Sequence, residues 1–476
     1  MKSKTLILAG AALLLSPMAM APMAMAQTAP AVVDPAAEKA AQAAAAAAAK
    51  ARAKQVSAWK RQYGEGPYPD ETDAFLGNKN EALKPYWTAL WTGGERNSVL
   101  NFQRLGLAAM EVGDWRTAEK SFDAALMRIE TVYAKDARAS AARSLFAKEA
   151  NKDFKGEPYE RSMAYYYRGL LYLRKGDFGN ARASFKGAEF QDTVSEQEEF
   201  GSDFAAMNYL IGWSTRCMGD NAGDDFAAAA KAEPTLTEPP RDHNVILIAE
   251  TGIAPMKVKD GAESEKMVFR AIEGMPETDA RFSLAPAGGR AMAVPTLQAS
   301  SVYYQATTRG GRAMDGILKG KANWKSGTAQ VGNLTTQAGL SMMNSGQGGS
   351  AGAYVAAAGM LFSMFSSAMK ADADVRYWDQ LPDGLELATA RIKGDFKPSV
   401  QFMSPSGPVD LKPAAIMTGG NDVCKVVWTR SRSALTGTDT PGDDIKVRAN
   451  VARKKDVALK DRAFRNSLAD FDQVAS

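Results

Sequence analysis

The sequence predicts an α+β protein in which an N-terminal α-helical repeat region precedes a mixed α/β domain with a small sheet. Small and aromatic residues recur three times at helical spacing between residues 98 and 234. Three prolines between Pro234 and Pro240 then end the helical pattern, and β-rich runs follow. The 476 residues suffice for two or three domains, so we expect a helical domain over 56–236 and an α/β domain over 241–434.

The helical region rests on a repeated spacing of glycine, alanine and phenylalanine. In each copy two glycines lie seven residues apart, the second is followed by aspartate, and alanine, phenylalanine and alanine come next. The copies are Gly106, Gly113, Ala118, Phe122, Ala125; Gly169, Gly176, Ala181, Phe185, Ala188; and Gly212, Gly219, Ala222, Phe226, Ala229. Small residues let two helices cross closely and Gly-Asp suits a turn, so the spacing predicts three helix pairs. The third pair has a turn shorter by two residues, and we expect it to meet at a different angle.

The pattern resembles the tetratricopeptide repeat (TPR). Together with three compact motifs at 153–161, 250–257 and 374–382, it resembles a family of exported, often lipid-anchored TPR-type envelope proteins of Gram-negative bacteria. Most of that family has no assigned activity, and the resemblance covers about residues 98–398. The chain departs from the family by lacking a lipid-anchor cysteine and by carrying a Gly/Ala/Met-rich insert. The resemblance implies a scaffold that holds an envelope protein or peptide.

A candidate binding groove follows from the same resemblance, because the first helix of each TPR pair lines the concave face. It implies a groove made of Gln103, Tyr166, Arg174, Tyr209, Trp213 and Arg216. Tyrosine, tryptophan and arginine dominate binding hot spots. The alternative is that these side chains pack against the next helix or against the α/β domain.

The first residues are typical of an exported protein. Two lysines, an apolar run and Ala24-Met25-Ala26 form the three parts of a secretory signal over residues 1–26. The apolar run is short for the alternative, a transmembrane anchor. We therefore expect a periplasmic protein, with outer-membrane association as an option. Residues 27–55 are alanine-rich and are predicted to form a solvated linker with a helical spacer.

In the second half we expect strands near 245–248, 267–272, 300–308, 399–403 and 423–428. Residues 351–369 carry no charge, which predicts a helix buried against the sheet or a partner; the alternative is membrane insertion. Residues 435–476 are polar and are expected to form a loose tail with one short helix.

The composition argues against several activities. The formal net charge is only +4, which offers no case for nucleic-acid binding. The single histidine, His243, rules out a two-histidine zinc site, and we predict no cofactor and no enzyme activity. A carbohydrate- or peptidoglycan-acting enzyme using Glu157 and Glu160, or Asp374, is the alternative. A second alternative is a membrane-inserting secretion component that uses residues 351–369.

Two cysteines, Cys217 and Cys424, are present. Export would permit a disulfide between them. Because each lies in an apolar stretch, the sequence favours two buried thiols and leaves the disulfide as the alternative.

Overall fold

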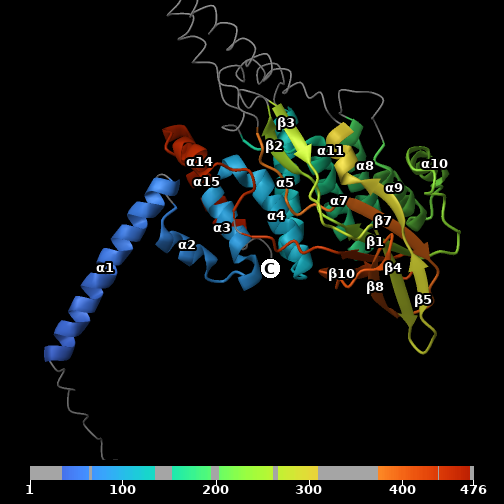
Figure 1. Cartoon of the computed structure of the whole chain (residues 1–476), viewed down its shortest axis with the longest axis horizontal. Coiled ribbons are helices and arrows are strands. Elements are labelled where there is room, and N and C mark those ends of the chain that lie inside the picture. Colours follow the sequence, from blue (N-terminus) through green and yellow to red (C-terminus); the bar gives the residue numbers. More distant parts are fainter. Residues whose placement is uncertain are drawn as a thin grey trace, which may run out of the picture. The chain divides into compact units, whose positions relative to one another are not determined.

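The computed structural model describes residues 35–63, 67–134, 153–193, 203–260, 266–308, 374–437 and 439–471 (Figure 1). The chain divides into two units, Met1–Gln55 and Val56–Ser476. The expected signal at 1–26 and the apolar segment at 351–369 lie outside the described residues. Within the ranges above, no helix combines the length and the apolar character that crossing a membrane requires.

Helix α1 (Pro35–Tyr63) contains the alanine-rich stretch. Its described side chains are mostly exposed, so intrinsic alanine propensity rather than packing holds it helical. The expected helical spacer is present, and it continues past residue 55 to Tyr63.

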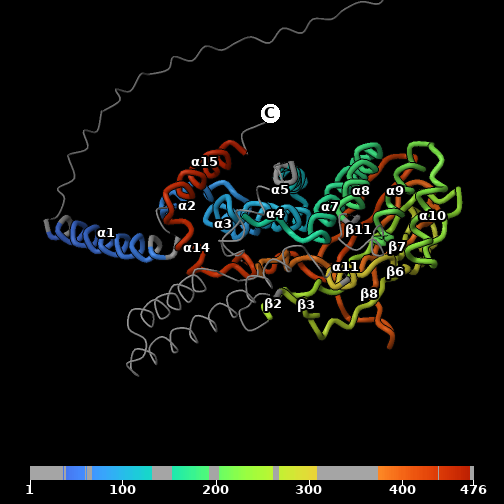
Figure 2. Tube along the Cα trace, turned by 90° about the horizontal axis from the view of Figure 1, so that it is seen from above, coloured from blue at the N-terminus to red at the C-terminus, as the bar shows by residue number. Residues whose placement is uncertain are grey.

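The fold class is α+β, as predicted. Within the second unit most of the described helices come first along the chain, and the described strands follow them. Figure 2 shows the helices succeeding one another along the trace. In order they are α2 (Pro69–Leu76), α3 (Lys84–Gly93), α4 (Ser98–Glu111), α5 (Trp115–Ala134), α7 (Pro158–Lys175), α8 (Phe178–Thr193), α9 (Ala205–Cys217) and α10 (Gly223–Ala232).

The three predicted helix pairs are confirmed as α4 with α5, α7 with α8, and α9 with α10. In each pair the glycine of the first helix faces the phenylalanine ring of the second. A Cβ atom added to the glycine would lie too close to the nearest carbon of the phenylalanine ring. The distance would be 2.9 Å for Gly106 and Phe122, 2.5 Å for Gly169 and Phe185, and 3.0 Å for Gly212 and Phe226. The second glycine of each copy lies in or beside the turn with positive φ, as in Gly176 at 74°.

The main sheet has five strands in the order β10-β11-β1-β7-β6. Strand β1 runs parallel to β11 and antiparallel to β7. The bounds are β1 (Val245–Thr251), β6 (Leu297–Ser301), β7 (Gly384–Ala390), β10 (Ala415–Gly420) and β11 (Lys425–Arg430).

A four-stranded sheet has the order β5-β4-β8-β9, and a separate hairpin pairs β2 with β3. Their bounds are β2 (Met256–Asp260), β3 (Lys266–Arg270), β4 (Asp279–Pro286), β5 (Met292–Pro295), β8 (Phe396–Ser404) and β9 (Gly407–Pro408). Most expected strands are therefore present.

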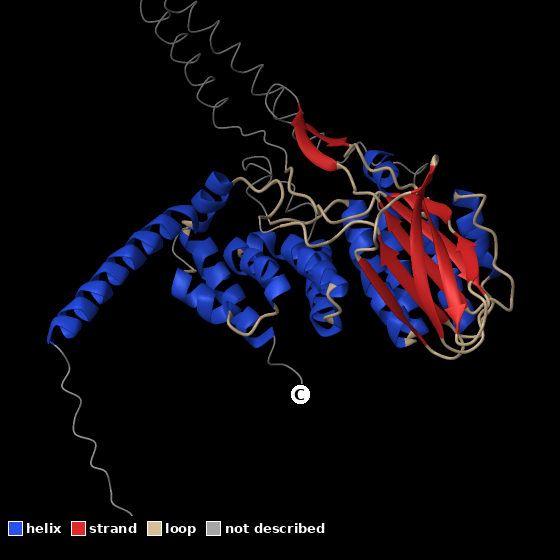
Figure 3. Ribbon diagram, turned by 60° about the horizontal axis from the view of Figure 1, so that its bottom comes forward, coloured by secondary structure: helices blue, strands red, loops and turns tan. Residues whose placement is uncertain are grey.

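Strand β1 is buried on both faces, and its side chains alternate between two cores. Ile246 and Ile248 join the core shared with the helices, whereas Val245, Leu247 and Ala249 join the core shared with the four-stranded sheet. The main sheet is thus the middle layer between helices and a second sheet. Figure 3 shows the strands, in red, lying across helices, in blue.

The expected strand at 300–308 is wrong after Ser301, where helix α11 (Val302–Thr308) begins. Its first turn is capped from two places. The Tyr304 amide donates to Ser301 Oγ at 3.1 Å, and the Tyr303 amide donates to Asp383 Oδ1 at 3.3 Å. Because Asp383 is distant in sequence, the local alternation could not reveal this cap.

The expectation of a loose tail over 435–476 is also wrong. Two helices, α14 (Ile445–Ala452) and α15 (Lys455–Phe471), lie there. Phe464 and Leu468 are buried on one face of α15, and the Phe471 ring lies 5.5 Å from that of Phe102 in α4. This apolar stripe docks the otherwise polar segment onto the first helix pair.

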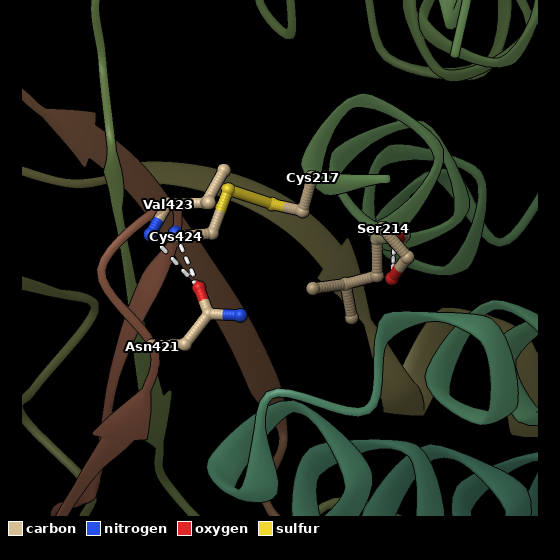
Figure 4. The surroundings of a disulfide bond; sticks show 6 residues. Ser214, Cys217, Asn421, Val423 and Cys424 are labelled. Carbon is tan, nitrogen blue, oxygen red and sulfur yellow. Dashed lines mark hydrogen bonds between the residues drawn. A yellow bond between two sulfur atoms is a disulfide. The ribbon is translucent and has the colours of Figure 1, made fainter. Parts of the chain in front are cut away.

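A disulfide joins Cys217 at the end of α9 to Cys424, beside the first residue of β11 (Figure 4). The preference for two buried thiols is therefore wrong. An apolar environment suits a thiol and a disulfide equally well, and only the fold reveals that the two Cα atoms approach to 5.8 Å. Asn421 Oδ1 orders the loop by accepting from the amides of Val423 and Cys424.

Candidate functional site

The predicted binding groove is not open in this structure. Gln103, Tyr166 and Trp213 are fully buried, and Tyr209 is 5% exposed. The chain's own sheet covers this face, and the Tyr166 hydroxyl donates to Glu250 Oε1 of β1 at 3.2 Å. The alternative given by the sequence, packing against the next helix or against the α/β domain, therefore describes these four side chains; Gln103, for example, donates to the Glu160 carbonyl of α7 at 3.4 Å.

The two remaining groove residues, Arg174 and Arg216, are only partly buried and contact their own chain. The Arg174 guanidinium lies over the Trp115 ring at 4.2 Å. Arg216 donates to the Pro239 carbonyl at 2.8 Å. The six residues thus do not form one accessible site.

Glu250 is the polar centre of the contact between the helices and the sheet. Its carboxylate accepts hydrogen bonds from Tyr166, from Tyr167 at 3.0 Å and from Trp428 Nε1 at 2.7 Å. Burial raises the pKa of Glu250, and the nearby Arg430 guanidinium opposes that rise. The network fixes β1 and β11 against α7 because a buried carboxylate needs all of these donors.

Glu157 and Glu160, considered for hydrolysis, belong to a second buried network. Glu160 accepts from Lys257 Nζ at 2.6 Å, from the Trp378 amide at 2.8 Å and from the Glu157 amide at 2.7 Å. It is fully buried, and that burial raises its pKa. These contacts connect the start of α7 to β2 and to the segment before β7.

Asp374, the third carboxylate considered, pairs with Arg376 at 2.7 Å. Arg376 is itself buried and donates to Asn97 Oδ1 at 2.8 Å. The geometry favours a structural role for all three carboxylates, since glycoside hydrolysis needs carboxyl groups that flank an accessible bond.

A cavity of about 400 Å³, here called the edge pocket, lies where β1 ends and β7 begins. The loop between β3 and β4 forms its other wall. The lining residues are Thr251, Gly252, Ile253, Ile272, Glu273, Gly274, Met275, Glu277, Thr278, Gln298, Asp383 and Gly384. This volume is within the range of small-ligand sites.

The lining of the edge pocket is acidic. It contains Glu273, Glu277 and Asp383, and no Lys, Arg or His is among its described residues. Glu277 is neutralised by Arg432, which donates twice at 2.6 Å. Burial by itself would raise the pKa of Glu277, but the Arg432 hydrogen bonds lower it overall. Glu273 and Asp383 are exposed to solvent and have no such partner among the salt bridges of the described residues.

Glu386 lies behind this lining, on the same face of β7 as Gly384. It is fully buried, and the only side chain that donates to it within the described ranges is Thr251, whose Oγ1 lies 3.5 Å from Oε1. Its Oε2 has no hydrogen-bond partner in the described part of the chain. Burial, reinforced by the charge of Asp279, raises the pKa of Glu386 to about 8.

Sequence reasoning did not single out Asp383 or Glu386. A usable signal was present, because Glu386 lies between Leu385 and Leu387 in a short apolar run that becomes β7. An acid at a core position of a strand often marks a functional or strained site.

No protein-family model, curated protein or solved structure matches this chain. Among the residues that the structure describes, no group of three or more His, Cys, Asp or Glu is arranged to hold a metal ion.

Proposed function

We propose that the protein is an exported, non-catalytic scaffold of the cell envelope that binds a protein partner, built on a TPR-like array. The repeated glycine–phenylalanine crossing in three successive helix pairs is the observation that carries this proposal. Such arrays serve mainly as binding surfaces, since each pair exposes a face that a neighbour or a ligand must cover.

The chain's own sheet occupies part of that surface. Tyr166 makes with the sheet the kind of buried aromatic contact that is common at binding hot spots. The partner must therefore engage a different surface, and we place it at the edge pocket, a concave site bounded by strand ends and a loop.

The disulfide supports export. Disulfides persist in oxidising compartments such as the periplasm and are rare in the cytosol. Cys217 and Cys424 are joined, which agrees with the secretory signal expected at 1–26.

Site-directed photocrosslinking in the envelope tests this function. A photoreactive amino acid at Glu273, an exposed residue of the edge pocket, should give a discrete crosslinked protein after irradiation. The matched control is the same amino acid at Lys412, which is exposed and outside the pocket. Residence of the protein in the cytoplasm, or equal crosslinking at both positions, would overturn the proposal.

A further inference from the structure

We propose that the edge pocket binds an organic cation, such as the ammonium group of a lysine side chain, between Asp383 at its mouth and Glu386 behind its inner wall. This inference rests on the proposed function in one respect: the cation is taken to belong to the protein partner. The cation chemistry itself can be tested without that partner.

The first argument is charge. Three of the lining residues are acidic, and among the salt bridges of the described part of the chain only Glu277 has a cationic partner, Arg432. Asp383 and Glu273 therefore leave the pocket negative. A cavity lined by one sign of charge concentrates ligands of the opposite sign.

The second argument is the unpartnered carboxyl oxygen of Glu386. A fully buried polar atom without a hydrogen bond is unfavourable, and native structures contain few. Three pocket-lining residues surround this side chain: Thr251, Gly384 and Gln298, which is its cross-strand neighbour. A donor entering the pocket would approach Glu386 from this side.

The direction of the side chain agrees with this. Glu386 Oε1 lies 2.8 Å from the place that a Cβ at position 384 would occupy. The carboxyl group therefore leans along β7 toward Gly384 and the pocket. Glycine at 384 leaves room for both Glu386 and Thr251 Oγ1, which would stand only 2.4 Å from that Cβ.

The third argument concerns the kind of ligand. The described acids do not converge as metal ligands, and the net negative lining disfavours anions. An ammonium group on an apolar stem suits a cavity whose lining also includes Ile253, Ile272 and Met275.

Protonation provides a specific signature. At neutral pH Glu386 holds its proton, because burial and the charges of Asp279 on β4 and Asp383 beside β7 oppose ionisation. The facing residues of β1 and β6, Thr251 and Gln298, are uncharged. A bound cation favours the ionised carboxylate, so binding should release a proton and strengthen as the pH rises.

Ligand-observed NMR titration of the full mature protein tests the proposal. The probes are N-acetyl-lysine methylamide, cadaverine and, as the uncharged control with the same four-carbon stem but no amino group, N-acetyl-norleucine methylamide. We expect both cations to bind, the norleucine derivative not to bind, and affinity for the cations to rise by about tenfold between pH 6.5 and 8.5. Preference for the lysine derivative indicates a protein side chain as the natural source, and preference for cadaverine indicates a free amine.

Two isosteric variants and one control locate the site. Glu386→Gln should abolish the pH dependence, and Asp383→Asn should weaken binding at every pH while keeping the Oδ1 acceptor that caps α11. Asp395→Asn, at a fully exposed acid outside the pocket, should bind as the wild type does. Absence of cation binding by the wild type, equal binding of norleucine, or an unchanged pH profile in Glu386→Gln would each overturn the inference. If one of these results is obtained but crosslinking at Glu273 is still observed, the scaffold function stands and only the cation site is wrong.

Discussion

Gly169 of α7 faces the Phe185 ring of α8 so closely that a methyl group at position 169 would stand 2.5 Å from the ring edge. Real Cβ atoms do not approach other atoms to this distance, so glycine here sets the separation of the two helices. The same contact at Gly106 and Gly212 leaves slightly more room, at 2.9 and 3.0 Å.

Gly169→Ala should therefore destabilise the protein by about 1–3 kcal/mol, although alanine normally favours a helix. Gly179→Ala is the matched control, because its Cβ would meet its nearest neighbour only at 3.9 Å in an exposed part of α8. Urea unfolding of both variants checks this. A Gly169→Ala midpoint at or above that of the wild type would contradict the close crossing.

Removal of the disulfide should lower the free energy of unfolding by about 2–5 kcal/mol, because the bond closes a loop of 207 residues in the unfolded chain. Thermal unfolding of Cys217→Ser/Cys424→Ser, compared with the wild type with and without a reductant, measures this. The double variant should be insensitive to reductant. A reductant effect of equal size in the variant would show that the bond is not its cause.

Trp213→Ala should cost about 3–5 kcal/mol, because the side chain is fully buried in the core to which the helices and the main sheet both contribute. Arg174→Ala should cost only about 0.5–1 kcal/mol, since it loses a partly exposed contact with Trp115. Urea midpoints of the two variants separate an interior position from a surface position. Equal, small losses would restore the open groove that the sequence suggests.

Lys257→Met should cost about 3–5 kcal/mol, because it leaves Glu160 buried without its cationic partner. Adding Glu160→Gln should recover part of that loss, since the neutral amide still accepts from the Trp378 amide. A double-mutant cycle in urea measures the coupling. Additive losses would mean that the 2.6 Å contact contributes nothing specific.

The protonation of Glu386 should also affect stability. Its pKa is about 8 in the folded protein and near 4.5 when unfolded. Between these values the folded state holds a proton that the unfolded state has released, so stability falls as the pH rises from about 5 to 8, by up to about 1.4 kcal/mol per pH unit. The difference in the free energy of unfolding between the wild type and Glu386→Gln, measured from pH 5 to 8, gives the contribution of Glu386 protonation. Parallel pH profiles would argue that Glu386 is ionised in the folded protein.

The local parts of the fold could be predicted from the sequence. The spacing of Gly169, Gly176 and Phe185 lies within one helix pair, so it encodes both the turn and the crossing. The pairing of β1 with β11 joins segments about 180 residues apart, and no spacing records it. The disulfide between Cys217 and Cys424 depends on that pairing as well, because Cys424 lies beside the first residue of β11.

The prediction of an open groove is wrong for a related reason. The aromatic character of Tyr166 and Trp213 indicates that something covers them, but the sequence does not distinguish a foreign partner from the chain's own sheet. Conversely, Glu386 and Asp383 come together with Thr251 only through strand registry. A site built by three strands and a loop has no contiguous motif to recognise.

The contact of α15 with the first helix pair has a consequence for the order in which the protein can fold. Phe471 contacts Phe102 and Trp87, and Asp461 accepts a hydrogen bond from the Glu95 amide at 2.9 Å. A chain that is synthesised from its N-terminus cannot cover these early helices until α15, which lies several hundred residues later, has been made. Truncation of the chain ahead of Phe464 therefore removes the cover of Phe102 and leaves an aromatic surface exposed to proteases and chaperones.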